Sequence, residues 1–162
     1  MQTHFQLMSY ETFFEQKDNL NKFVQVITKT SHISLRLLDY FCVNYAKKHN
    51  TIYRLSNGKM FNVYLNYKTQ LKLKTKKCFD PFRRKDRYVL HEKYITTIGQ
   101  MFFFEWCIEN EILEYVENNI LLITNDMKHS TIVPRVKKSK IQKNDKKIAV
   151  LYSKKDGFVL KF

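Results

Sequence analysis

The chain has 162 residues, a mass of 19.7 kDa and a formal net charge of +14. This length predicts one hydrophobic core, and a hydrophobic content of 44% predicts a folded domain, not a disordered chain. With only three Gly and two Pro residues, the sequence excludes a fold of many tight turns and a glycine-rich phosphate loop.

The first part of the chain predicts two helices. Apolar residues within Leu20–Ile27 repeat with helical spacing, and Asp18 and Asn19 precede them as candidate N-cap residues. The polar stretch Lys29–Ser34 predicts a connector that ends in a helix cap. A stronger apolar stripe then predicts a second helix over Leu35–His49.

A β-hairpin is predicted next. The runs Thr51–Leu55 and Met60–Leu65 are rich in β-branched and aromatic residues, and they flank the pair Asn57-Gly58, which is typical of a type I′ turn. Residues Tyr67–Lys85 favour a continued strand or an exposed turn, within which Lys74–Asp86 is interpreted as an ordered loop anchored by aromatic residues.

The second half predicts one more strand and a long helix. The strand is expected at Arg87–His91, and Thr96 and Thr97 are candidate caps for a helix over Ile98–Glu109. Asn110 is expected to cap this helix or to bend its continuation, which reaches about Asp126. Its outer face is acidic and repels phosphate, so we expect it to serve as core scaffold. The acidic residues are Glu105, Glu109, Glu111, Glu114 and Glu117.

The C-terminal part predicts an arm and a last hairpin. Residues 128–146 are basic and lack periodicity, which predicts a linker or arm within a single domain spanning 1–162. Ile148–Tyr152 and Phe158–Phe162 predict a hairpin that pairs with the central one. The expected fold class is therefore α+β, with helices packed on a small antiparallel sheet made of a central and a C-terminal hairpin.

The positive charge is concentrated in two segments. Between Asn66 and Tyr94 ten basic residues stand against three acidic ones, and between Arg135 and Lys155 nine stand against one. The rest of the chain holds ten basic and eleven acidic residues. Clustered like charge destabilises a fold unless an anionic partner neutralises it, so the pattern favours a polyanion, although lysine-rich solvated surfaces also occur.

These two segments supply the candidate nucleic-acid-binding residues. Lys and Arg neutralise phosphates, while interleaved aromatic residues stack on unpaired bases or anchor the loop in the core, and for Phe79 and Phe82 both readings stay open. The candidates are Lys68, Lys72, Lys74, Lys76, Lys77, Arg83, Arg84, Lys85, Arg87, Arg135, Lys137, Lys138 and Lys140.

Catalytic and metal-binding motifs are weak. Lys154–Gly157 matches the K-x-D-G pattern of nucleotidyltransferases, but the five residues that follow cannot build a nucleotide pocket, so a hairpin turn is the better interpretation. No C-x-x-C or H-x-x-x-H spacing predicts zinc. A minimal nuclease centre could be assembled only from His91-Glu92-Lys93 beside Asp80 or Asp86. We expect no enzyme activity, metal, cofactor or small-molecule substrate.

Two further sequence patterns predict the cellular compartment of the protein. No run of about 18 apolar residues occurs, and Met1–Tyr10 lacks the features of a secretory signal, which predicts an intracellular protein with no membrane partner. The cysteines are odd in number and far apart in the sequence, so reduced thiols are expected. They are Cys42, Cys78 and Cys107.

Three stretches resemble a group of short uncharacterised proteins of nucleocytoplasmic large DNA viruses. They are Ser34–Asn50 (SLRLLDYFCVNYAKKHN), Phe61–Arg84 (FNVYLNYKTQLKLKTKKCFDPFRR) and Thr96–Asn110 (TTIGQMFFFEWCIEN). The resemblance implies a setting in the cytoplasm or nucleus of an infected cell, or in the virion, and carries no activity. From the residues themselves we expect a non-enzymatic protein that binds DNA or RNA through the phosphate backbone. The alternative is an interaction or virion-structural module with an acidic protein partner.

Overall fold

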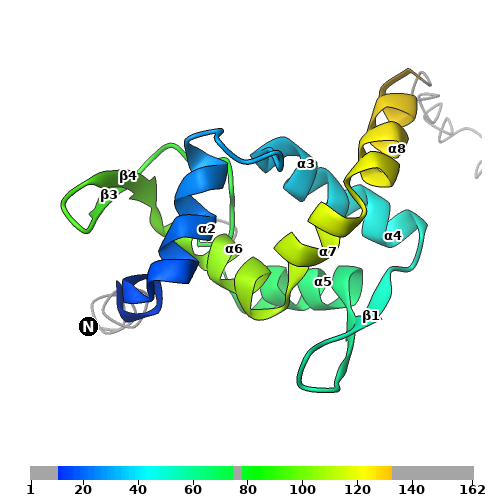
Figure 1. Cartoon of the computed structure of the whole chain (residues 1–162), viewed down its shortest axis with the longest axis horizontal. Helices are drawn as coiled ribbons and strands as arrows, with labels where there is room; N and C mark the ends of the chain where they lie inside the picture. The colour runs from blue at the N-terminus through cyan, green and yellow to red at the C-terminus, as the bar shows by residue number, and fades with distance from the viewer. Residues whose placement is uncertain (1–10, 75–77, 133–162) are drawn as a thin grey trace, which may run out of the picture. The chain divides into compact units, whose positions relative to one another are not determined.

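The computed structural model describes residues 11–74 and 78–132 (Figure 1). The described residues up to Thr131 belong to one compact unit. The predicted C-terminal hairpin lies outside the described residues, as does most of the predicted arm, so the single-domain interpretation stays a prediction. Within the described ranges, no helix is both long and apolar enough to cross a bilayer.

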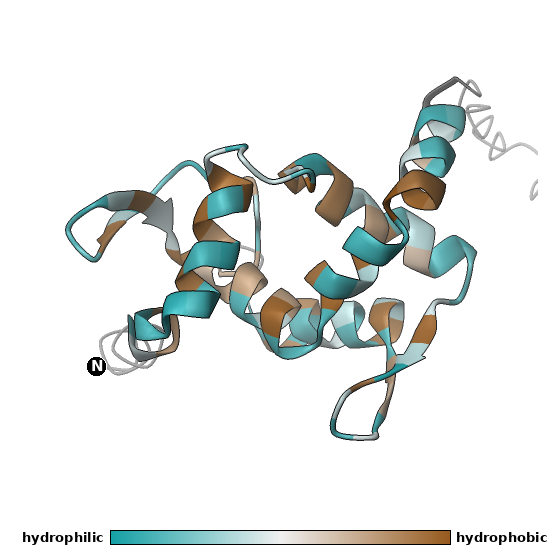
Figure 2. Ribbon diagram, viewed as in Figure 1, coloured by the Kyte–Doolittle hydropathy of each residue, from teal (hydrophilic) through white to brown (hydrophobic). Residues whose placement is uncertain are grey.

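The first long helix, α2, spans Lys17–Ile27 and carries hydrophobic residues on one side and hydrophilic residues on the other (Figure 2). Its predicted cap is wrong, because Gln16 is the N-cap residue. The Asn19 side chain is buried inside the helix, where it donates hydrogen bonds to the backbone oxygen of Phe13 at 3.1 Å and to the side chain of Gln16 at 3.0 Å. These two hydrogen bonds satisfy the buried amide of Asn19, which lies within the first turn of α2 and not at its N-cap position.

A second helical segment follows in three parts: α3 over Leu35–Tyr40, the π-helical turn η1 over Phe41–Tyr45, and α4 over Ala46–Lys48. The Ser34 hydroxyl accepts a hydrogen bond from the Leu37 backbone N–H at 3.1 Å, which confirms the predicted cap. The helix itself is confirmed. The π-turn was not predicted, since apolar spacing does not reveal a single widened turn.

The central hairpin is confirmed. Strand β1, Ile52–Arg54, pairs antiparallel with β2, Met60–Asn62, and Tyr53 lies opposite Phe61. Its turn is not type I′, because Gly58 alone among the turn residues has a positive φ, at 84°.

The second strand is shorter than predicted because a helix replaces its end. Helix α5 spans Val63–Leu73, and the Asn62 side chain caps it by accepting a hydrogen bond from the Leu65 backbone N–H at 3.0 Å. Val63 and Tyr67, four residues apart, form its buried side. The prediction of a strand through Leu65 and an extended continuation is therefore wrong.

A second hairpin pairs β3, Arg87–Leu90, with β4, Tyr94–Thr97. Strand β3 was predicted and is confirmed, whereas β4 was not predicted. The turn residues His91 and Glu92 have φ of 49° and 54°, the double left-handed pattern of a type I′ turn, although Asn, Asp and Gly are the usual residues there.

Helices α6, Ile98–Glu109, α7, Ile112–Asn118, and α8, Ile120–Ile132, complete the described fold (Figure 1). The Thr97 hydroxyl caps α6 as predicted, accepting from the Gln100 backbone N–H at 3.3 Å. Asn110 is the C-cap residue of α6, as the sequence predicts, and Glu111, with φ of 54°, separates α6 from α7. Since α8 reaches Ile132, the first residues of the predicted linker or arm, 128–132, are helical.

Helix α6 is buried on most of its circumference and forms the centre of the core. Its Phe104 packs edge-on against Phe23 of α2, with ring centroids 4.9 Å apart. Trp106 packs against Tyr67 of α5 at 5.9 Å and donates a hydrogen bond to Asn66 at 2.7 Å. The helices and the two hairpins confirm the α+β class. The described sheets are two separate pairs of strands.

Candidate nucleic-acid interface

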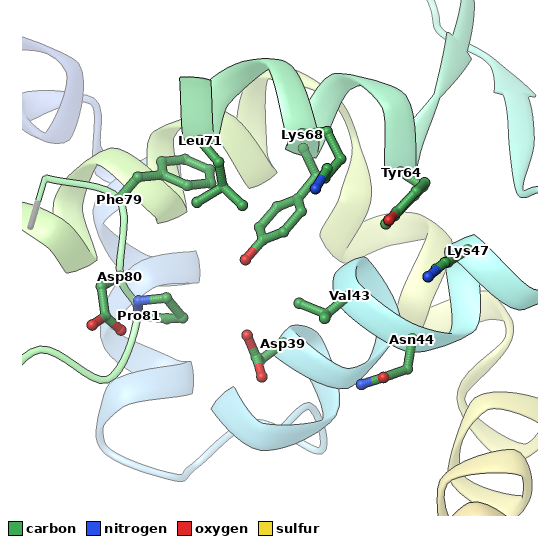
Figure 3. Close-up of a pocket in the computed structure, with 11 residues that line it drawn as sticks. Asp39, Val43, Asn44, Lys47, Tyr64, Lys68, Leu71, Phe79, Asp80 and Pro81 are labelled. Carbon is green, nitrogen blue, oxygen red and sulfur yellow. The ribbon is translucent and has the colours of Figure 1, made fainter. Parts of the chain in front are cut away.

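A pocket of about 620 Å³ lies between the segment α3–η1–α4, helix α5 and the loop that leads to Pro81. Asp39 and Asn44 belong to the first wall, and Lys68 and Leu71 to the second (Figure 3). The Asp80–Pro81 backbone forms part of the third wall, where the Gln100 side chain of α6 donates to the Pro81 oxygen at 3.0 Å.

One end of the pocket is cationic and aromatic. Lys47 from α4 and Lys68 from α5 lie there together with Tyr64 (Figure 3). The Lys47 ammonium lies 5.7 Å from the centroid of the Tyr64 ring, so a cation–π contact connects the two walls. Both lysines are exposed, but Lys47 is not among the predicted binding residues because it lies outside the basic clusters.

The other end is acidic. Asp39 is half-buried, and its burial raises the pKa of its carboxyl, an effect to which the nearby charge of Asp80 adds. Burial also raises the pKa of Tyr67 to about 12, again with a contribution from Asp39. The Asp39 carboxylate therefore lies in a partly desolvated space in which the nearby charge of Asp80 further destabilises its charged form.

Five predicted binding residues are exposed. Lys68 and Lys72 are one turn apart on α5, and three more follow Pro81 in the loop and at the start of β3: Arg84, Lys85 and Arg87. Within the described ranges, none of the five forms an ion pair with an acidic residue. They remain available to an anionic partner.

Lys74 is placed differently from its neighbours on α5. Its ammonium lies 4.1 Å from the centroid of the Phe102 ring, on the acidic helix α6. Burial lowers its pKa, while the charges of Glu105 and Glu109 act in the opposite direction. Of the predicted cations, Lys74 therefore faces protein rather than a free surface.

Arg83 also has a protein partner. Its guanidinium forms an ion pair with Asp86 three residues later, and its side chain is only 18% exposed. The predicted residues Lys76 and Lys77 lie outside the described residues, as do those of the second cluster, Arg135, Lys137, Lys138 and Lys140.

The two phenylalanines of the basic loop predicted over Lys74–Asp86 have different roles. Phe79 is 2% exposed and packs against Tyr67, Phe103 and Trp106 at centroid distances of 5.6–5.8 Å, which makes it a core anchor. Phe82 is 48% exposed. The open alternative is thus resolved for Phe79, which is too deeply buried to stack on a base.

The acidic side of α6 contains a carboxyl group with unusual protonation. Burial, with a contribution from Glu109, raises the pKa of Glu105 to about 7 from an ordinary value of 4.5, and Lys74 only partly opposes this shift. Because the folded state binds the proton more tightly than the unfolded state, the free energy of unfolding falls as pH rises from about 4.5 to about 7.

Glu105→Gln should remove this pH dependence. We expect the variant to be more stable than the wild type at pH 8 by on the order of 1 kcal/mol, a value reduced by solvent screening, and to gain nothing at pH 4. Urea unfolding at both pH values measures the difference. Glu117→Gln, at an exposed position of α7, is the matched control and should keep the wild-type pH dependence. An unchanged pH slope in Glu105→Gln would contradict the raised pKa.

The residues from which a nuclease metal centre could be assembled, His91 to Lys93 with Asp80 or Asp86, do not form such a centre among the described residues. Asp80 lines the pocket and accepts a hydrogen bond from the Phe82 backbone, whereas Asp86 pairs with Arg83. The His91 ring contacts the Phe14 backbone oxygen at 3.3 Å. In the described part of the chain, no three His, Cys, Asp or Glu side chains gather in a way that could hold a metal ion.

Comparisons with known proteins give a family but no activity. The family model DUF7197, described as a family of unknown function, matches residues 4–158. "Uncharacterized protein L507" of Acanthamoeba polyphaga mimivirus is 40% identical over 134 residues, which cover 75% of this chain and 52% of the mimivirus protein. The chain thus spans about half the length of that relative. No solved structure matches.

Proposed function

The chain belongs to DUF7197, and we propose that it is a non-enzymatic nucleic-acid-binding protein that grips the phosphate backbone through the basic segment, residues 68–87. The segment's exposed cations hold the backbone, and the second basic cluster after Arg135 adds further phosphate contacts. Similarity to a mimivirus protein supports an infected cell or a virion as the setting.

The observation that carries the proposal is the exposed pair Lys68 and Lys72 on α5. No described acidic residue neutralises either side chain, and Lys47 adds a third exposed ammonium across the pocket. Exposed lysines on neighbouring turns suit a polyanion with regularly repeated charges, because each displaces a condensed counterion when it meets a phosphate.

A second candidate function has its own observation. Leu65 and Leu73, on the same helix as Lys68 and Lys72, are 63% and 74% exposed. Exposed leucines beside cations are typical of a surface that binds an acidic protein partner, since apolar contact supplies much of the affinity at protein interfaces.

A binding panel separates the two functions. Labelled single-stranded DNA, double-stranded DNA and RNA are titrated with the full chain, alongside poly-glutamate of the same length. We expect at least one nucleic acid to bind with a Kd of about 1–100 μM near physiological salt, and poly-glutamate to bind at least tenfold more weakly. Equal or tighter binding of poly-glutamate would contradict the proposal and favour the acidic protein partner.

A further inference from the structure

The pocket beside the basic segment has two ends of opposite charge. Lys47 and Lys68 lie at one end, Asp39 and Asp80 at the other, and the aliphatic side chains of Val43 and Leu71 lie between them (Figure 3). Its volume of about 620 Å³ falls within the range of small-ligand sites. A ligand that fits carries an anion at one end, a flat or apolar body, and hydrogen-bond donors at the other end.

The cationic end suits a phosphate. The ammonium groups of Lys47 and Lys68 come from opposite walls, and Asn44 adds an amide that can donate to a phosphate oxygen. Tyr64 holds Lys47 at the rim through the cation–π contact at 5.7 Å. Both walls thus supply a cation to this end of the pocket.

The acidic end requires donors. Among the described residues, no cation forms an ion pair with Asp39 or Asp80, and the Asp39 carboxylate makes no described hydrogen bond. A half-buried carboxylate is stabilised by N–H groups that point at it. The exocyclic amine of cytosine offers such a group, and carboxylate side chains are known acceptors for it. Uracil presents a carbonyl oxygen at the same position, which a carboxylate repels.

We propose that this pocket takes one unpaired nucleotide of a bound strand, with its phosphate at Lys47 and Lys68 and its base against Leu71, and that Asp39 selects cytosine over uracil by accepting a hydrogen bond from the exocyclic amine. The inference rests on the proposed function, because the strand is held by the basic segment. The pocket would add a preference for one base to a surface that otherwise contacts only phosphates.

The test compares two strands whose bases differ only at position 4 and at the adjoining N3. Single-stranded oligo-dC and oligo-dU of about ten nucleotides, a length that one small binding domain covers, are titrated with the full chain at pH 7.5. We expect oligo-dC to bind about tenfold more tightly, the usual effect of one satisfied against one opposed polar contact in a partly desolvated site. This comparison needs no variant, so it does not depend on whether a variant folds.

Asp39→Asn assigns the preference to its residue. An amide can donate to uracil as well as accept from cytosine, so the variant should bind both strands within about twofold of each other. Asp18→Asn, at an exposed position of α2, is the matched control and should keep the tenfold ratio. Lys47→Ala should weaken both strands by the same factor and leave their ratio unchanged.

The outcomes separate this inference from the proposed function. Tight but equal binding of both strands by the wild type, or a cytosine preference that survives in Asp39→Asn, overturns the base pocket and leaves phosphate binding standing. Failure to bind any strand overturns the proposed function itself.

Discussion

Reversing two charges on α5, in a Lys68→Glu/Lys72→Glu variant, should lower the affinity for a single-stranded oligonucleotide by at least about tenfold near 0.1 M salt. Two phosphate contacts are lost, and two carboxylates now repel the backbone. The two residues are exposed and make no described ion pair, so the fold should be little affected. Fluorescence anisotropy measures the affinity, and thermal unfolding checks the fold.

A matched control changes the net charge by the same amount elsewhere. Lys17 is the first residue of α2, Lys29 lies two residues beyond its end, and both are exposed. Lys17→Glu/Lys29→Glu should reduce the affinity by less than about threefold through long-range electrostatics alone. Equal losses in the two double variants would show that only net charge matters, and would remove α5 as the binding surface.

Replacing Phe79 should have the largest effect on stability. Phe79→Ala removes a fully buried ring that contacts Tyr67, Phe103 and Trp106, and it should lower the free energy of unfolding by about 3–4 kcal/mol. Phe82→Ala, at a half-exposed ring three residues away, should change it by less than about 0.5 kcal/mol.

Chemical denaturation of both variants measures these values. The comparison is internal, because the two substitutions delete the same atoms from the same loop. If Phe82→Ala destabilised the chain as much as Phe79→Ala, the assignment of Phe79 alone as the core anchor of the basic loop would be wrong.

Helix positions could be predicted where one face is consistently apolar and the cap residue is unambiguous. Ser34 and Thr97 begin their helices as the sequence indicates, because each hydroxyl has a free backbone N–H three residues ahead. Asn19 misled the prediction, since a buried amide with two acceptors looks the same in sequence as a cap.

The strand predicted through Leu65 shows why short patterns are ambiguous. Phe61, Val63 and Leu65 alternate as a strand does, yet Val63 and Tyr67 also fit one face of a helix. Two side-chain hydrogen bonds favour the helix: Asn62 accepts from the Leu65 backbone N–H, and Trp106 of α6 donates to Asn66. The second bond is a tertiary contact, which local sequence cannot reveal.

In the two hairpin turns, apart from Gly58, the residues with positive φ are not the ones that residue type predicts. Asn57 does not adopt the positive φ that its pairing with Gly58 predicts, whereas His91 and Glu92 both do. The register of β3 with β4 fixes the second turn, so strand pairing overrides the intrinsic preference of its residues.

The sequence predicts some residues of the candidate site but not others. Charge clustering selected Lys68 and Lys72, which the structure places on one exposed helix. It could not select Lys47 or Asp39, because both lie in a different helical segment and reach the pocket only through tertiary packing. Clustering also included Lys74, whose ammonium packs on Phe102 beside the acidic side of α6.

The slope of binding affinity against salt concentration tests the central claim most directly. Five exposed cations between Lys68 and Arg87, each displacing counterions from a single strand, predict that the logarithm of the association constant falls against the logarithm of salt with a slope of about −3.5 or steeper. The measurement is a KCl series with the full chain and a single-stranded oligonucleotide. A slope near zero would mean that no phosphates are neutralised, and would contradict the account.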